Sequence, residues 1–294
     1  MHLALFSGSP AVRYMLLSAL GFALMAVCVK AVALEGIPVF EIVAARAIVS
    51  LFLSYFDIKR KGLSVWGNNK PMLVARGVVG AIALVCVYYS VTTLPLAEAT
   101  MLQYTYPAFT ALIALWFLKE RVQLATMVCI AMSLVGLVVM VQPDWSGGFS
   151  NGLLLSFPPL SLAAALAGAL GSAIAYVLVR KLSQTDDSSV IIFYFPLIAF
   201  PISVMLLGDN FVMPNAYSLL LLLLVGVFTQ VGQVGLTKAM AAEKAGKASA
   251  YAYVQVIFSA LLGWMFFAEV PTLYTVIGGG LIIAGALINT LYKR

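Results

Sequence analysis

The chain has 294 residues, of which 63% are hydrophobic and only 10% are charged, and its formal net charge is +6. Soluble domains carry roughly 45–50% apolar and about 25% charged residues. The 17 Lys and Arg residues and 11 Asp and Glu residues cannot cover the surface of a soluble fold of this size. The composition therefore excludes a soluble protein and predicts an integral, multi-pass membrane protein embedded in a lipid bilayer.

Apolar stretches follow one another along the chain, each long enough for a helix that crosses roughly 30 Å of hydrocarbon. They lack the strict alternation of barrel strands, which favours an all-α polytopic fold. The run after Arg13 lasts a full span, so no cleavable signal peptide is expected. We predict ten transmembrane helices, over residues 12–33, 38–56, 71–92, 98–118, 123–142, 158–180, 188–207, 216–238, 248–268 and 272–291.

The placement of the basic residues predicts the orientation of these helices. If the N-terminus is cytoplasmic, the inside segments carry every Lys and Arg residue except Lys30 and Arg46, with Arg76 counted beside Lys70. The outside loops carry none, which is the asymmetry of the positive-inside rule. We therefore expect a protein of the bacterial inner (plasma) membrane with both termini in the cytoplasm. The excess of positive charge implies no nucleic-acid partner.

Few residues suit metal, cofactor or catalytic chemistry. Cys28, Cys86 and Cys129 fall inside predicted spans and lack metal-ligand spacing, so neither a metal nor a cofactor is expected. The only histidine, His2, lies in the N-terminal tail, so serine–histidine chemistry within the membrane has no base. An enzyme is therefore not expected. A channel or a non-transporting scaffold is the stronger alternative function, although no carbonyl filter motif or ring of like charges is visible.

The chain repeats itself at an offset of 149 residues, which places residues 99–142 on residues 248–291. The matches include a scarce residue type, since Glu120 falls on Glu269. Each half contains five predicted helices, an odd number, so the second half must insert with the opposite orientation. Inverted repeats are a feature of secondary transporters, in which the substrate binds near the bilayer midplane between the halves. We predict two five-helix repeats, residues 1–147 and 148–294, that form a transporter of small molecules.

Two segments also carry a resemblance to a known family. The first runs from Tyr88-Tyr89-Ser90 through Leu94-Pro95-Leu96-Ala97-Glu98-Ala99 to Tyr106-Pro107, Phe109-Thr110-Ala111-Leu112 and Leu118-Lys119-Glu120. The second runs from Lys247-Ala248-Ser249 through Ala268-Glu269 to Gly285, with Val256 in the place of Pro107. Both resemble the EamA-type repeat of the drug/metabolite transporter superfamily. The resemblance implies two inverted halves, a cavity among helices 1, 3, 4, 6, 8 and 9, and export or exchange of small organic metabolites by alternating access.

Arg46 is the clearest charged residue inside a predicted span. A charge at mid-bilayer costs roughly 2.5–3.5 kcal/mol on insertion scales, so such a residue normally faces a cavity or a partner. One interpretation is that Arg46 binds an anionic group of the substrate or forms a gate ion pair with Glu41. The other is that it snorkels to the interface or bonds freed backbone carbonyls of a neighbouring helix.

Uncharged polar residues supply further candidates for substrate binding. Gln230 and Gln233 share one face of the eighth helix, and hydrocarbon offers their amides no partner. Pro107 lacks an N–H, so the Gln103 carbonyl loses its helical partner, which is tolerated where it lines a cavity or packs on protein. Hydrogen bonding between helices is the competing interpretation for the glutamines. With tyrosines added from the helices that the family uses for its cavity, the candidates are Arg46, Tyr88, Gln103, Tyr104, Tyr176, Gln230, Gln233, Tyr251 and Gln255.

Glu120 and Glu269 end the fourth and ninth predicted spans, on opposite faces of the membrane. Each is placed to accept hydrogen bonds from the N-terminal amides of the next helix, where negative charge is favoured. We interpret both glutamates, with Pro107, as residues that fix turns, and gating is the alternative. The glycines of the tenth span, residues 278–280 and 285, allow close helix approach, either within the chain or in a homodimer.

Overall fold

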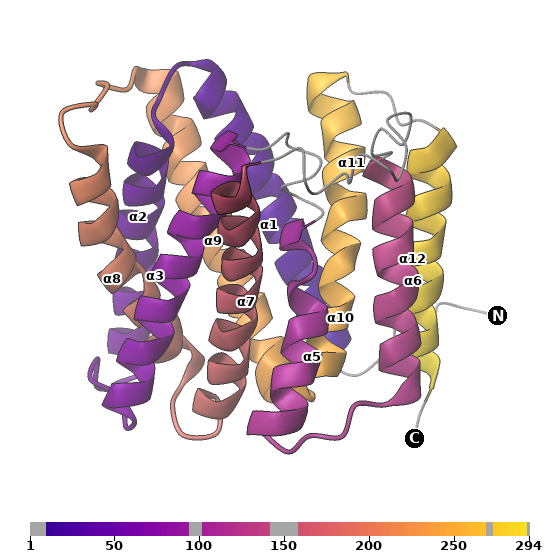
Figure 1. Cartoon of the computed structure of the whole chain (residues 1–294). Helices are drawn as coiled ribbons and strands as arrows, with labels where there is room; N and C mark the ends of the chain where they lie inside the picture. Colours follow the sequence, from indigo (N-terminus) through magenta and orange to yellow (C-terminus); the bar gives the residue numbers. More distant parts are fainter. Residues whose placement is uncertain (1–9, 94–101, 142–157, 269–272, 293–294) are drawn as a thin grey trace.

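The computed structural model describes residues 10–93, 102–141, 158–268 and 273–292, and every element in these ranges is helical. Seven helical stretches of the described chain, one of which is the interrupted stretch Ala245–Phe267, are long and apolar enough to cross a membrane. Three shorter apolar helices fall on further predicted spans. The prediction of an all-α polytopic fold is confirmed. The elements are α1 (Pro10–Leu34), α2 (Val39–Arg60), α3 (Lys70–Thr93), α5 (Tyr106–Phe117), α6 (Leu124–Val141), α7 (Pro159–Leu182), α8 (Ser188–Leu207), α9 (Ala216–Ala242), α10 (Ala245–Ala250), the 3₁₀ turn η4 (Tyr251–Tyr253), α11 (Val254–Phe267) and α12 (Leu273–Leu291) (Figure 1).

The fourth and ninth predicted spans are not continuous α-helices. α5 begins only at Tyr106, and Pro107 lies in its first turn, where a missing N–H leaves no intrahelical bond unmade. In the second half, α10 ends at Ala250 and the turn η4 separates it from α11. Val256 stands where the first half has Pro107, so the second interruption forms without a proline.

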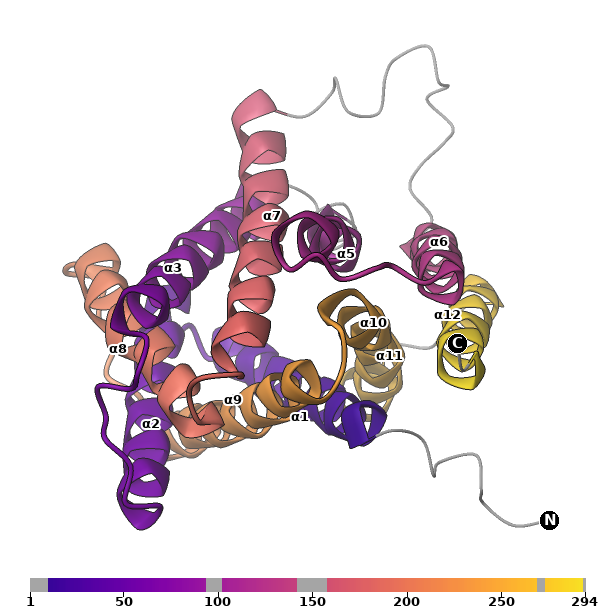
Figure 2. The same cartoon turned by 90° about the horizontal axis from the view of Figure 1, so that it is seen from below.

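The main contacts between a helix of the first half and a helix of the second half have counterparts in which the two halves change places. α1 contacts α9 as α7 contacts α3, α2 contacts α9 as α8 contacts α3, and α1 contacts α11 as α7 contacts α5. Two further pairs, α2 with α8 and α6 with α12, map onto themselves under this exchange. The last pair lies side by side at one edge of the bundle (Figure 2). The predicted boundary between residues 147 and 148 lies outside the described residues.

Small residues allow the helices of the two halves to approach closely. A Cβ on Gly21 of α1 would lie 2.8 Å from the backbone nitrogen of Gly232 in α9, and the Ser18 hydroxyl donates to the Gly232 carbonyl at 2.8 Å. At the edge pair, a Cβ on Gly136 of α6 would lie 2.5 Å from the carbonyl oxygen of Gly278. The glycines of α12 thus serve internal packing through Gly278, and a homodimer stays a prediction.

One end of the bundle is tightly packed. α2, α7 and α9 all finish at this end, which is at the bottom of Figure 1. We name it the basic end because it carries Lys59, Arg60, Lys61, Arg180, Lys181, Lys238, Lys244 and Lys247. Its interior is filled by side chains with at most 1% exposure that belong to one core cluster: Ile58, Leu73, Leu182, Leu236 and Met240. The structure is therefore closed at the basic end.

Candidate functional site

A cavity of about 370 Å³ lies between the two halves of the chain. α1, α2 and α3 contribute to its wall from the first half, with α5 and the residues just before it, and α7, α8, α9 and α11 contribute from the second. A volume of this size is typical of small-molecule sites, which range over roughly 300–1,000 Å³. The cavity lies between two halves that pack in equivalent ways, and secondary transporters with inverted repeats bind their substrates at this place.

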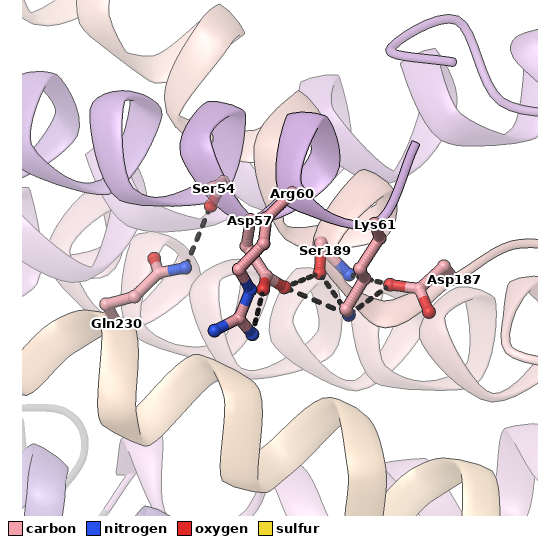
Figure 3. Close-up of polar contacts among 7 residues, drawn as sticks. All are labelled: Ser54, Asp57, Arg60, Lys61, Asp187, Ser189 and Gln230. Atoms are coloured by element: carbon pink, nitrogen blue, oxygen red, sulfur yellow. Dashed lines mark hydrogen bonds and ion pairs between the residues drawn. The ribbon is translucent and has the colours of Figure 1, made fainter. Parts of the chain in front are cut away.

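The structure brings most of the candidate binding residues to this cavity: Arg46, Gln103, Tyr104, Tyr176, Gln233 and Gln255 line it. Gln230 does not line it, because its side-chain nitrogen donates to the Ser54 hydroxyl of α2 at 2.8 Å (Figure 3). Tyr251 is 2% exposed, and its hydroxyl donates to the Asn289 carbonyl of α12 at 3.2 Å. Gln230 and Tyr251 therefore connect helices. The side chain of Tyr88 and the whole of Glu269 lie outside the described residues.

Arg76 also lines the cavity, and its assignment to a cytoplasmic basic segment is wrong. It lies in α3 with 3% exposure, and its Nη2 atom donates a long hydrogen bond of 3.4 Å to Oε1 of Gln233. Its Nε and Nη1 atoms are buried and have no hydrogen-bond partner in the described part of the chain. The sequence did contain a signal for this site, because Arg76 falls within the predicted span 71–92.

Arg46 and Arg76 lie close to the same aromatic ring. The guanidinium carbon of Arg46 is 5.7 Å from the centroid of Phe195 in α8, and that of Arg76 is 4.8 Å from it. Glu41, the possible gate partner of Arg46, instead accepts a hydrogen bond from the backbone N–H of Val212 at 3.0 Å. No acidic side chain is among the described residues that line the cavity. Two positive charges therefore face it without a carboxylate to balance them.

Tyrosines from both halves form another part of the wall. Tyr106, which begins α5 and is not among the nine candidates named from the sequence, meets Tyr176 of α7 edge to face with ring centroids 5.1 Å apart. Tyr104 stacks on Tyr253 of η4 at 6.2 Å. Aromatic faces of this kind accept flat or apolar groups, and their hydroxyls can hydrogen-bond a polar one. This tyrosine wall, made of Tyr104, Tyr106 and Tyr176 where it faces the cavity, is the second recognition element of the site.

Glu120 acts at the basic end and is not in the cavity wall. Its Oε1 atom pairs with Nε of Arg180 at 2.9 Å, and its Oε2 atom accepts from the backbone N–H of Ala245 at 2.8 Å. The expected bond to the helix that follows Glu120 is thus replaced by one to α10 in the other half. Arg180 also donates to the carbonyls of Met240 and Ala241 at 2.9 Å. This group ties the ends of α5, α7 and α9 to the start of α10.

A second polar group joins α2 to α8 at the basic end (Figure 3). Nζ of Lys61 lies 2.9 Å from carboxylate oxygens of both Asp57 and Asp187, and the Ser189 hydroxyl donates to Asp57. Burial alone would raise the pKa of Asp187, but hydrogen bonds from Lys61 and from the Ser189 backbone outweigh it and hold the pKa below its ordinary value. The charged pair therefore stabilises this end at neutral pH, and the stabilisation is lost as the pH falls through the lowered pKa.

Comparison with known proteins identifies the family. The model of the EamA-like transporter family matches residues 9–142 and again residues 159–291, one match in each half. The chain belongs to the EamA-like transporter family. The family match, together with relatives that are named as transporters, places the chain in the drug/metabolite transporter superfamily, so the protein is a small-molecule secondary transporter and not an enzyme.

Individual relatives of the transporter carry different names, some of which include a substrate. It is 32% identical over 279 residues to the pseudopaline exporter CntI of Pseudomonas aeruginosa, covering 95% of each chain. It is 28% identical over 289 residues to solute carrier family 35 member G1 of Mus musculus, covering 96% of this chain and 78% of that one. A riboflavin transporter of Rhizobium johnstonii is 31% identical over 232 residues, or 78% of this chain and 74% of its own. A crystal structure matches 96% of both chains with a TM-score of 0.82 and 20% identity, which shows a shared fold.

The two glutamines of α9 provide a matched test of the site. We expect Gln233→Leu to weaken transport, because it removes an amide from the cavity wall, at roughly 0.5–1.5 kcal/mol per neutral hydrogen bond. We expect Gln230→Leu to lower the melting temperature in detergent and leave the apparent substrate affinity unchanged, because its amide bonds Ser54. Melting temperature and concentration-dependent uptake are measured on one preparation of each variant. An unchanged affinity in Gln233→Leu would remove Gln233 from the site.

Proposed function

We propose that this protein exports or exchanges small organic metabolites across the bacterial inner membrane by alternating access, with the cavity as its substrate site. The observation that carries the proposal is the cavity itself, which lies between the two halves and is lined by residues of both. The family relation supports the transport of small molecules, since relatives are named as an exporter, a riboflavin transporter and an S-adenosylmethionine uptake transporter. We choose export as the direction because it is the one in the name of the relative with 32% identity over 95% of both chains.

Alternating access requires the closed basic end to open. The opening has to separate the core cluster at this end and the ion pair that joins Glu120 to Arg180, which are side chains of different halves. We propose that Arg46, Gln103, Tyr104, Tyr176, Gln233 and Gln255, with Arg76 and Tyr106, contact the substrate. Glu120, together with the polar group of Lys61, Asp57 and Asp187, then holds the basic end shut until the halves move.

The test compares metabolites released by cells that overproduce the protein with those released by cells that carry an empty vector. Any compound released only by the overproducing cells is then loaded into vesicles that contain the purified full-length protein. A carrier that alternates is expected to exchange external for internal compound faster than it releases compound into an empty medium. Equal rates would indicate a channel, and the absence of any released compound would contradict export.

The orientation is tested by cysteine labelling in intact cells. We expect cysteines at Lys61 and Lys181 to be shielded from an impermeant thiol reagent, because the positive-inside rule places the basic end in the cytoplasm. A cysteine at Phe211 is the control, because this residue is 58% exposed in the connection between α8 and α9, at the other end of α8. It is expected to react. Labelling at Lys181 with protection at Phe211 would reverse the orientation.

A further inference from the structure

The cavity contains more positive charge than the protein balances. Arg46 and Arg76 are 8% and 3% exposed, and both guanidinium groups lie beside the ring of Phe195. In the described part of the chain, neither forms an ion pair, and the only hydrogen bond of Arg76 is the long one to Gln233. Both arginines lie inside a membrane-spanning bundle, where insertion of a charge is disfavoured.

The two charges also repel one another. Coulomb interactions strengthen as the dielectric constant falls, so like charges in the wall of a protein cavity disfavour each other more than they would in bulk water. Phe195 moderates this repulsion through its negative ring face, but a ring supplies no lone pairs for the free N–H groups. Burial of donors without acceptors is unfavourable, so the free N–H groups of Arg76 favour an acceptor that the described part of the protein does not supply.

We propose that the substrate of this transporter is an organic anion with at least two acidic groups, which Arg46 and Arg76 bind. This inference rests on the proposed function of the cavity as the substrate site. The acidic groups are carboxylates or phosphates, whose oxygens match the planar fork of guanidinium N–H donors. The remainder of the molecule is flat or apolar and lies against the tyrosine wall and apolar residues such as Leu84 and Val87.

Other substrate charges fit the site less well. A cation would add to the repulsion between the arginines, and a neutral molecule would leave both charges unbalanced. A purely structural role for Arg76 is also a poor fit, because one hydrogen bond of 3.4 Å uses only one of its five N–H groups. Its Nε and Nη1 atoms remain available for an acceptor that enters the cavity.

The test separates released metabolites by charge. Medium from cells that overproduce the wild type, Arg76→Gln, Arg76→Lys or Arg13→Gln, and from vector-only cells, is passed over an anion exchanger at pH 7 and analysed by mass spectrometry. We expect the compounds released only with the wild type to be retained with the strength of a molecule with two or more negative charges. Phosphatase treatment distinguishes the two chemistries, since it weakens retention of phosphate esters and leaves carboxylates unchanged.

The variants connect this charge to the cavity. We expect Arg76→Gln to raise the apparent KM for the released compound by roughly tenfold to a hundredfold, which is the usual value of a hydrogen bond to a charged group. Arg76→Lys keeps the charge without the fork and is expected to fall between Arg76→Gln and the wild type. Arg13→Gln is the control, because Arg13 is exposed near the start of α1 and is not in the cavity wall. The amount of each variant in the membrane is measured in parallel.

Each outcome has a distinct meaning. Release of neutral or cationic compounds by the wild type would overturn the anion inference and leave the transport function intact. So would wild-type kinetics in Arg76→Gln. If the wild type changes no compound relative to the vector, the proposed export function fails, and this inference fails with it. If Arg76→Gln does not accumulate, Arg76→Lys and the charge of the compounds that the wild type releases still decide the inference.

Discussion

Arg46→Ala is expected to reach the membrane in normal amounts and to lose at least nine-tenths of its transport, a tenfold change that corresponds to about 1.4 kcal/mol. In the described part of the chain, Arg46 has no side-chain hydrogen bond or ion pair, and its guanidinium lies beside the ring of Phe195, so its removal leaves no buried acceptor unsatisfied. Removal of a charge from a span also lowers the cost of insertion, by roughly 2.5–3.5 kcal/mol on insertion scales. The loss therefore falls on substrate binding, where a hydrogen bond to a charged group contributes about 1.5–3 kcal/mol.

The measurement compares uptake, membrane content and melting temperature for Arg46→Ala and for Arg13→Ala. Arg13 is exposed near the start of α1, so its substitution is expected to leave all three quantities near wild type. Uptake by Arg46→Ala at the wild-type rate would mean that Arg46 does not bind the substrate and that its guanidinium only snorkels to the interface. A fall in membrane content that accounts for the whole loss of uptake would likewise contradict a binding role.

Gly235→Ala is expected to cause a large loss of stability by forcing α1 and α9 apart. A Cβ at this position would lie 2.6 Å from the carbonyl oxygen of Tyr14 and 2.8 Å from the backbone nitrogen of Ser18, both in α1. Backbone atoms cannot rotate away, so α1 and α9 must separate. Overpacking of this kind costs typically 1–3 kcal/mol, and contact with backbone places Gly235→Ala at or above the upper end of that range.

Gly280→Ala in α12 is the matched control, because a Cβ there would meet nothing within 4 Å. Alanine in place of an unconstrained helical glycine is favourable by roughly 0.5–1 kcal/mol, so this variant is expected to melt at or slightly above the wild-type temperature. Both variants are compared by thermal unfolding in detergent and by their amount in the membrane. Equal melting temperatures would show that α1 and α9 do not pack as closely as the structure has them.

The sequence by itself determined the fold class and much of the organisation. Each membrane-spanning helix has to satisfy its own backbone hydrogen bonds and present apolar side chains to lipid, so composition and span length are local properties that can be read along the chain. The internal repeat is equally local, because the match of Glu120 with Glu269 and of their surroundings needs no coordinates. These two observations were enough to predict ten helices in two inverted halves.

Only the tertiary structure decided which polar residues share the cavity. Gln230 and Gln233 belong to the same face of α9 by spacing, yet Gln230 meets Ser54 of α2 and Gln233 meets Arg76 of α3. Membrane burial requires that an amide find a partner, but it does not specify whether the partner is another helix or a substrate. That choice depends on which side chains α2 and α3 present at the same depth, and these come from distant parts of the chain.

Arg76 and Glu120 show the same division. Along the chain, Arg76 follows a basic segment and Glu120 precedes a helix, so local rules assigned the first to the cytoplasmic surface and the second to the next helix. In the fold, Arg76 lines the cavity beside Phe195, and Glu120 binds Arg180 and the start of α10. The physical reason is that these partners are contributed by the second half of the chain. The sequence shows that a polar side chain in a membrane span needs a polar partner. The packing of the two halves decides whether that partner is another helix, the cavity or a residue at the end of the bundle.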